Sequence, residues 1–210
     1  MNIRSKAGLI VALSVLTATA HAEFSTNIGW VSDYYYRGVF QKTSSANGGV
    51  DYANKGFYAG TWAADVGDGL EIDGYFGYGG EISEFTYGVG FTGYYYTGDF
   101  DDTYEEVNLS AGYSFVTFDY AVGRYQNFSE VALDYNYYSV TFEYKGFYGK
   151  YAGFSQDFSG EYFEAGFGTT AAGVDLGLAL IVNDSDLNVF SDTDGDEALF
   201  FTVGKTFDIQ

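Results

Sequence analysis

The sequence predicts an all-β fold, a transmembrane antiparallel up-and-down β-barrel of about twelve strands. Apolar and polar residues alternate with a period of two along most of the chain, which is typical of strands with two unlike faces. Proline is absent and 29 residues are glycine, which suits paired strands joined by tight turns. The 22 tyrosines and 20 phenylalanines require a large surface to bury or embed. Together these features indicate a barrel whose outer wall faces lipid.

Residues 1–22 have the pattern of an export signal. Arg4 and Lys6 form a positive start, residues 7–16 are apolar, and Ala20-His21-Ala22 matches an A-x-A cleavage site. We therefore expect residues 23–210 to form one barrel domain. Cysteine is absent, so we expect neither a lipid anchor nor a disulfide. No later segment approaches the ~20 consecutive apolar residues of a membrane helix.

The composition after residue 22 argues against most enzymes. The single histidine, His21, lies in the signal, so the remaining chain lacks both histidine and cysteine. Ser-His-Asp triads, Cys-His dyads and His-bound zinc all need those side chains. We expect no enzymatic activity and no cofactor. Without Arg4 and Lys6, seven basic residues face 29 acidic ones, a net charge of −22, which argues against a nucleic-acid partner.

Alternation gives approximate spans for twelve strands, an even number as in single-chain bacterial barrels. In residues 106–113, for example, Val107, Leu109 and Ala111 share one face, whereas Glu106 and Asn108 lie on the other. The expected spans are 24–36, 46–53, 56–66, 69–78, 84–96, 104–115, 117–126, 130–138, 139–152, 160–170, 173–182 and 196–207.

Connection lengths add a second signal, because barrels have long links at one end and short turns at the other. Longer polar links are expected at residues 39–45, 97–103, 153–159 and 183–195. Tight links are expected at 53–55, 115–117, 138–139 and 170–173, while the links after the third and seventh strands are also short. Tyrosine clusters at strand ends, at 34–36, 94–96 and 137–138, suit aromatic girdles at the membrane interfaces.

Two local motifs resemble binding sites and a third is a repeated string; all three are better explained by structure. Gly88-Val-Gly-Phe-Thr-Gly93 matches a dinucleotide motif, but a strand continues after it, so its glycines are expected to make room for bulky neighbours. Acidic residues at 184–188 and 192–197 resemble calcium loops but fail the EF-hand spacing; a solvated acidic loop is favoured over weak Ca²⁺ binding. The near copies at 55–60 and 145–150 reflect repeated strand chemistry more than an old duplication.

Function is expected to depend on the residues that alternation places inside the barrel. Acids on this face predict a wet lumen, since isolated buried carboxylates are costly, and rings of acids favour cations. The alternative is that the acids pair with bases and tyrosines and fill a closed interior. The expected pore-lining residues are Asp33, Arg37, Asp51, Glu71, Asp73, Glu84, Glu106, Asp119, Glu130, Asp134, Glu143, Lys145, Glu164 and Asp175.

Two strings in the first third of the chain after the signal resemble a known family. Ser32-Asp-Tyr-Tyr-Tyr-Arg-Gly-Val39 and Gly56-Phe-Tyr-Ala-Gly-Thr-Trp-Ala63 look like the N-terminal signature of the TorF family of porins, proteobacterial proteins formerly labelled conserved hypotheticals. The resemblance implies an outer-membrane barrel and a channel. The chain departs from the pattern at Tyr35, where the family often has a second arginine. Many outer-membrane barrels end in an aromatic residue, whereas this chain continues past Phe207.

These observations predict an outer-membrane channel of a Gram-negative cell, through which small hydrophilic solutes or cations diffuse passively. The expected surroundings are outer-membrane lipid and lipopolysaccharide. A second hypothesis is a non-conducting structural or surface barrel whose acidic extracellular loops bind a partner. A third is an exported soluble β-protein.

Overall fold

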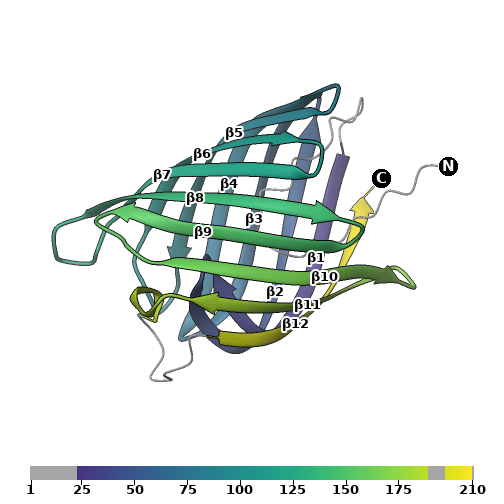
Figure 1. Ribbon diagram of the computed structural model, residues 1–210. Helices are drawn as coiled ribbons and strands as arrows, with labels where there is room; N and C mark the ends of the chain where they lie inside the picture. Colours follow the sequence, from purple (N-terminus) through teal and green to yellow (C-terminus); the bar gives the residue numbers. More distant parts are fainter. Residues whose placement is uncertain (1–22, 189–196, 210) are drawn as a thin grey trace.

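The computed structural model describes residues 23–188 and 197–209. Within them the chain forms a closed antiparallel barrel in which every strand pairs with its sequence neighbours and β1 pairs with β12 (Figure 1). This confirms the predicted fold class. The elements are β1 (Glu23–Tyr36), β2 (Val39–Asn54), β3 (Phe57–Gly67), β4 (Gly69–Ile82), β5 (Phe85–Tyr96), β6 (Tyr104–Tyr113), β7 (Val116–Tyr125), β8 (Leu133–Tyr144), β9 (Phe147–Gln156), β10 (Glu161–Ala171), β11 (Val174–Asn183), the 3-10 helix η1 (Ser185–Leu187) and β12 (Glu197–Ile209). The expected signal at residues 1–22 lies outside the described residues.

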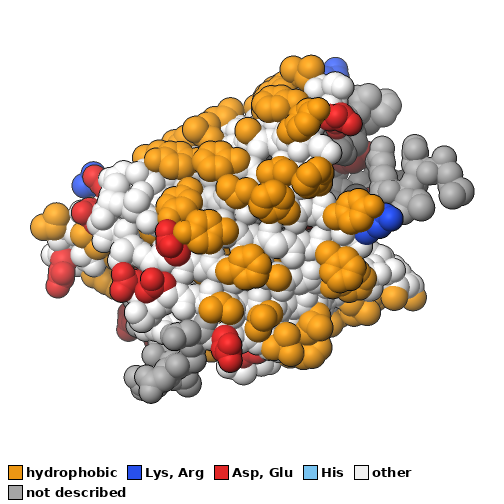
Figure 2. Space-filling model, in the orientation of Figure 1, with side chains coloured by type: hydrophobic (Ala, Val, Ile, Leu, Met, Phe, Trp, Pro, Cys, Tyr) orange, Lys and Arg blue, Asp and Glu red, His pale blue; other side chains and the backbone are white. Residues whose placement is uncertain are grey.

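The outer wall of the barrel is apolar on all twelve strands. Figure 2 shows apolar side chains spread over one face of the wall, with the visible acidic side chains mostly toward one end. Strand residues alternate between this wall and the interior, as the period of two predicts. Exposed outward side chains, one from each strand in order, are Ile28, Val50, Phe57, Phe76, Val89, Leu109, Phe118, Phe142, Tyr151, Phe163, Leu178 and Leu199.

The two ends of the barrel differ in the length of their links. Five two-residue turns, at 55–56, 83–84, 114–115, 145–146 and 172–173, lie at the end that holds both termini of the barrel domain, which we call the short-turn end (Figure 1). At Lys55-Gly56 and Lys145-Gly146 both residues have positive φ, which suits the twist of a hairpin. The near copies at 55–60 and 145–150 therefore share a turn and the start of a strand.

Longer links gather at the opposite end, which we call the long-link end. They cover residues 97–103, 126–132, 157–160 and 184–196, of which 189–196 lie outside the described residues. The link after the seventh strand is thus longer than expected. The expected turn at 138–139 is wrong, because β8 runs through these residues to Tyr144. The Lys145-Gly146 pair supplies the turn instead.

The β1–β2 connection also differs from the prediction of a long link at residues 39–45. These residues belong to β2, and the turn is the pair Arg37-Gly38. Pairing of β1 with β12 ends at Val31, and pairing of β2 with β3 starts only at Asn47. Residues 33–46, which we call the inner hairpin, therefore leave the wall and fold into the barrel, where Arg37 reaches Glu106 on β6.

Inward tyrosines lie over glycines on the neighbouring strand. Tyr135 faces Gly123, and a Cβ at Gly123 would lie 2.2 Å from the Tyr135 ring. The same pairing joins Tyr58 to Gly77, Tyr75 to Gly60 and Tyr148 to Gly166. Gly90, in the dinucleotide-like string, also makes room for Tyr58, and β5 continues through that string as a strand. The structural explanation of that motif is confirmed.

Candidate functional site: the barrel interior

An ion pair holds the tip of the inner hairpin against the opposite wall. Both terminal nitrogens of the Arg37 guanidinium, Nη1 and Nη2, donate to Glu106, each at 2.7 Å. The Glu106 side chain is fully buried and that of Arg37 is 14% exposed. The Arg37 guanidinium also lies 4.1 Å from the ring centre of Tyr137, a cation–π contact. Such a bidentate pair fixes geometry as well as charge.

Tyrosine hydroxyls satisfy the rest of the Glu106 carboxylate. Tyr94 donates to Oε1 at 2.7 Å and Tyr135 to Oε2 at 2.9 Å. Gly38, beside Arg37, has φ +88° and a carbonyl that accepts from Asn183 at 3.1 Å. A Cβ at Gly38 would lie 2.7 Å from both Tyr162 and Leu187. The Arg37-Gly38 turn is therefore closely fitted to side chains from β10, β11 and η1.

A second carboxylate site lies at the base of the inner hairpin. Glu71 is fully buried and accepts from Tyr34 at 2.7 Å and from Tyr96 at 3.3 Å. Asp73, on the same strand, is 2% exposed, and its Oδ1 has no partner among the described residues. Lys42, in the hairpin, pairs with Asp65. These contacts attach both arms of the hairpin to β3 and β4.

An aromatic cluster, Tyr104, Tyr125, Tyr135, Phe154 and Phe158, packs near the long-link end on the β6–β9 side. The rings of Tyr104 and Tyr125 stack at 4.3 Å, and those of Tyr135 and Phe158 at 4.9 Å. Asp101 in the link above accepts from Tyr125 at 2.8 Å and Tyr104 at 2.9 Å. Burial raises the pKa of Asp101 above its ordinary value, although these hydrogen bonds act in the opposite direction. The cluster and the hairpin together narrow this half of the interior.

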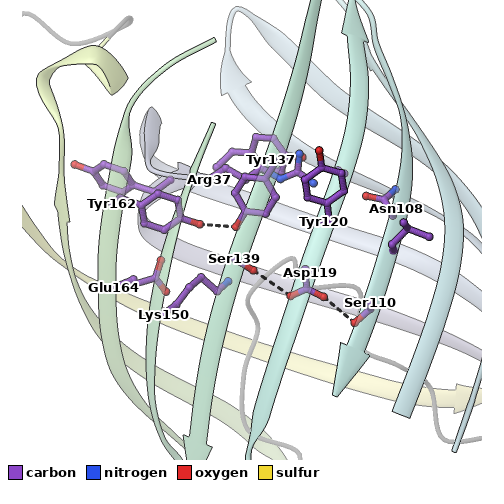
Figure 3. A pocket seen from close by; sticks show the side chains of 14 residues that line it. Arg37, Asn108, Ser110, Asp119, Tyr120, Tyr137, Ser139, Lys150, Tyr162 and Glu164 are labelled. Carbon is purple, nitrogen blue, oxygen red and sulfur yellow. Dashed lines mark hydrogen bonds between the residues drawn. The ribbon is translucent and has the colours of Figure 1, made fainter. Parts of the chain in front are cut away.

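Inside the barrel, a cavity of about 80 Å³ adjoins the hairpin tip. Figure 3 shows its lining side chains converging from β6–β10 and from Arg37. Asp119 accepts from Ser110 at 2.7 Å and from Ser139 at 3.1 Å, and the hydroxyls of Tyr137 and Tyr162 bond at 2.9 Å. The remaining charged lining groups are Lys150 and Glu164. The site thus combines both signs of charge with tyrosine.

Most of the predicted inward residues lie inside the barrel. The hairpin and cavity involve Arg37, Glu71, Asp73, Glu106, Asp119 and Glu164. Asp51, on β2, accepts from Tyr75 at 2.5 Å and Asn27 at 3.3 Å. Glu143 and Asp175 lie on the inward-facing positions of β8 and β11 near the short-turn end. For all of these inward residues, a role in lining a pore stays a prediction.

Five predicted residues are placed differently. Asp33, half-buried at the start of the inner hairpin, accepts from its neighbour Ser32. Glu84, Glu130 and Lys145 are exposed in connections and do not face the interior. Asp134 faces outward, 59% exposed, with Arg124 at 3.6 Å. The error on β8 has one cause: Tyr135 and Tyr137 point inward, which places Asp134 on the outer face.

The interior also contains residues that alternation did not identify. Lys150 is 7% exposed and lines the cavity. The position of the Lys145-Gly146 turn decides which residues of β9 face inward, and it places Tyr148 and Lys150 on the inner face. Recognition of this turn in the sequence would therefore have predicted the position of Lys150. Tyr34, Tyr94 and Tyr137 are buried inside and do not belong to an outer girdle, whereas Tyr95 is exposed outside as expected. Glycines at every second position of one strand leave room for large side chains on the next strand. Such glycines would have predicted that the tyrosines opposite them face inward.

Of the two acidic strings, residues 184–188 are described and residues 192–196 lie outside the described residues. Asp184 caps η1 by accepting from the Asp186 amide at 3.0 Å. Within residues 23–188 and 197–209, no three His, Cys, Asp or Glu side chains are grouped so that they could hold a metal ion. In the same residues no helix is long and apolar enough to cross a membrane.

These features define a class of protein: a closed antiparallel barrel with an apolar outer wall and a charged interior entered by its own first hairpin. The chain belongs to the Gcw_chp family, described as bacterial proteins of unknown function, whose model matches residues 16–207. This match does not test the narrower resemblance to the TorF family. No curated protein matches the chain.

Several solved structures are similar to the chain. Pseudomonas aeruginosa OccK2 (OpdF), in complex with glucuronate, is 12% identical over 86% of this chain and 61% of its own, with a TM-score of 0.43. Acinetobacter baumannii OccAB3 is 14% identical over 87% and 60%, with a TM-score of 0.43. A structure from a study of in-meso crystallization of membrane proteins is 8% identical over 89% and 84%, with a TM-score of 0.52. The chain spans about three-fifths of the length of the first two. The third, at 8% identity, supports the fold alone.

Proposed function

We propose that the protein is an outer-membrane channel through which small hydrophilic solutes or cations diffuse, and that its inner hairpin sets the narrowest level. The lipid and lipopolysaccharide of an outer membrane are its proposed surroundings, reached through the N-terminal export signal. Diffusion through such a lumen needs neither a catalytic group nor a cofactor.

The observation that carries this proposal is the orientation of side chains across the closed wall. Each of the twelve strands exposes apolar side chains outward, while Asp51, Glu71, Glu106, Asp119 and Glu164 lie inside. A soluble barrel would reverse this arrangement, because its apolar residues would fill the interior. In a bilayer, the outer wall meets hydrocarbon, and closure of the sheet pairs every strand with two neighbours.

The surplus of interior acids supports a preference for cations. Among the described residues these acids outnumber the interior bases Arg37 and Lys150, together with Lys42 in the inner hairpin. Carboxylates along a pore stabilise cations and repel anions. Glu143 and Asp175 lie nearer the short-turn end and are less buried than the carboxylates around the hairpin. They are the groups best placed to set this preference without disturbing the hairpin.

Conductance of the refolded protein in a planar bilayer tests the proposal. A KCl gradient should give stable openings with a cation-selective reversal potential. The double variant Glu143→Gln/Asp175→Asn should lower the cation preference, while Glu84→Gln, in an exposed turn, should leave it unchanged. A correctly inserted barrel that stays silent in every variant, including one without the inner hairpin, would contradict the channel.

The hairpin also favours a second candidate, a non-conducting structural or surface barrel. The Arg37–Glu106 pair, the Tyr34–Glu71 bond and the aromatic cluster all occupy the interior toward the long-link end. If these contacts close the lumen permanently, the exposed acidic links remain as the surface for a partner. Silence of both the wild type and the hairpin-deleted protein would favour this candidate.

A further inference from the structure

The cavity beside the hairpin tip contains an ammonium group that the protein itself does not neutralise by contact. Lys150 lies on β9, directly opposite Glu164 on β10 and Thr141 on β8. Its side chain is only 7% exposed. In the part of the chain that the structure describes, Lys150 makes neither an ion pair nor a hydrogen bond. Leaving such a group unpaired away from water is costly, so the cavity is suited to something that binds it.

The direction of Lys150 identifies where that partner would lie. Figure 3 shows its ammonium directed away from Glu164, toward the side where Ser139 and Asp119 lie. Ser139 and Ser110 already donate to the two oxygens of Asp119. Because Lys150 makes no hydrogen bond within the described residues, the three donors of its ammonium remain available to an acceptor inside the cavity.

Glu164, on the strand next to Lys150, has a carboxylate oxygen that needs a hydrogen-bond donor. Its Oε1 accepts from Tyr148 at 2.5 Å, while its Oε2 accepts from no described side chain. Glu164 is 6% exposed and lines the cavity with Lys150. A carboxylate oxygen without a donor can accept a further hydrogen bond, and the bond is stronger when the donor is charged. The cavity thus presents one free cationic group and one free anionic oxygen, on adjacent strands.

Size and wall chemistry restrict the ligand further. A cavity of about 80 Å³ has room for on the order of six water-sized groups. Alanine has a matching number of non-hydrogen atoms. Tyr137 and Tyr162 line the cavity from inside the barrel and offer both ring faces and hydroxyls. A short aliphatic part can lie against the rings while charged ends reach Lys150 and Glu164.

We propose that this cavity binds a small zwitterionic solute, an α-amino acid of alanine size, whose carboxylate is bound by Lys150 and whose ammonium is bound by Glu164. The site would be a subsite on the path of the proposed channel, so it rests on that function for its role, although not for its existence. A simple anion would leave Glu164 unpaired and bring negative charge near Asp119. A simple cation would meet the Lys150 ammonium. A ligand with both charges satisfies both groups at once.

Binding to the refolded full-length barrel in detergent tests the inference without any need for conduction. The probe is alanine, observed by saturation-transfer NMR. Two comparison ligands each keep one charged group of alanine: propionate lacks the ammonium, and ethylamine lacks the carboxylate. Alanine should bind about tenfold or more tightly than either half, because each charged contact is worth at least that much.

Single substitutions assign the two charges. Lys150→Met and Glu164→Gln should each weaken alanine binding about tenfold or more. The matched controls Lys145→Met and Glu84→Gln, in exposed turns, should bind alanine like the wild type. Heat-modifiable migration in gels checks that each variant forms a barrel. Should Lys150→Met fail to fold, Lys150→Gln keeps a polar side chain and tests the same loss of charge.

Each outcome is decisive. Preference for alanine, lost in both site variants, supports the zwitterion site even if the bilayer experiment finds a silent barrel. Binding of propionate or ethylamine as tight as that of alanine overturns it in favour of a site for a single charge. Wild-type alanine binding in Lys150→Met, or absence of alanine binding, also overturns it, whether or not the protein conducts.

Discussion

At the scale of single residues, Glu106 shows how this interior accommodates buried acids with few bases. Its carboxylate receives four hydrogen bonds, two from Arg37 and one each from Tyr94 and Tyr135. Glu71, Asp51 and Glu164 also accept from tyrosine hydroxyls. Tyrosine supplies a donor without adding a charge, so the barrel can keep an excess of acid inside.

Breaking the Arg37–Glu106 pair on one side should destabilise the barrel strongly. Arg37→Met leaves a buried carboxylate with only its tyrosine donors, and removal of one partner of a buried pair typically costs about 3–5 kcal/mol. We expect a lower urea midpoint in detergent micelles. Arg124→Met, which removes the exposed contact with Asp134, is the control and should change the midpoint little. Equal effects in both variants would contradict a structural role for the buried pair.

Gly123 should tolerate no side chain, because its space belongs to Tyr135. A Cβ there would lie 2.2 Å from the Tyr135 ring, so Gly123→Ala must displace the ring and its bond to Glu106. Overpacking of this kind costs about 1–3 kcal/mol. Gly88→Ala is the control, also facing inward, where the nearest atom is 3.8 Å away. Urea unfolding of the two variants checks this, and equal midpoints would show that Tyr135 can move freely.

At the scale of elements, the inner hairpin is the part of the fold that decides whether the lumen is open. Two strands leave the wall together, pair with each other beyond Val31 and Asn47, and bring Arg37 across the interior. Because β1 still pairs with β12 as far as Val31, and β2 with β3 from Asn47, the barrel can close without residues 33–46.

Deletion of residues 33–46, with a short glycine link in their place, should therefore raise single-channel conductance while the barrel still folds. The hairpin tip and its contacts with Glu71, Glu106 and Asn183 would be gone, and the lumen would widen. Bilayer recordings at one salt concentration compare the variant with the wild type. Shortening the exposed link 126–132 is the control and should leave conductance unchanged. An unchanged conductance after hairpin removal would show that another part of the interior limits flow.

At the scale of the whole molecule, the outer wall determines where the protein resides. Leu109 lies in the middle of β6 with 48% of its surface exposed, in a band that continues around all twelve strands. Exposure of this apolar band to water would be unfavourable, whereas contact with lipid hydrocarbon is not. The third hypothesis, an exported soluble β-protein, conflicts with such a wall.

Leu109→Arg should destabilise the protein in lipid vesicles by about 2–4 kcal/mol, because a charge would enter the middle of the bilayer. The measurement is urea unfolding from vesicles, followed by tryptophan fluorescence. Val131→Arg, in the 126–132 link with 81% exposure, is the control and should have little effect. If both variants unfold alike, the outer wall does not face hydrocarbon.

The sequence alone determined the closed antiparallel barrel and its strand number, because a period of two is a local property that repeats from strand to strand. It also placed Glu71, Glu106, Asp119 and Glu164 inside correctly, on strands where apolar and acidic residues alternate clearly. On β8 it failed, since tyrosine fits either face and only the Lys145-Gly146 turn fixes the phase. Lys150 was missed for the same reason.

Only the tertiary structure revealed the inner hairpin and the cavity. Arg37 and Glu106 are 69 residues apart, and Gly38 and Asn183 are 145 apart. Neither pair can be recognised from sequence periodicity, because each forms only after the closed barrel brings the inner hairpin against other strands. Local alternation states which face a residue occupies, whereas contacts across a lumen depend on the register of every strand between them. The wall of this protein was therefore readable from its sequence, and the contents of its interior required the fold.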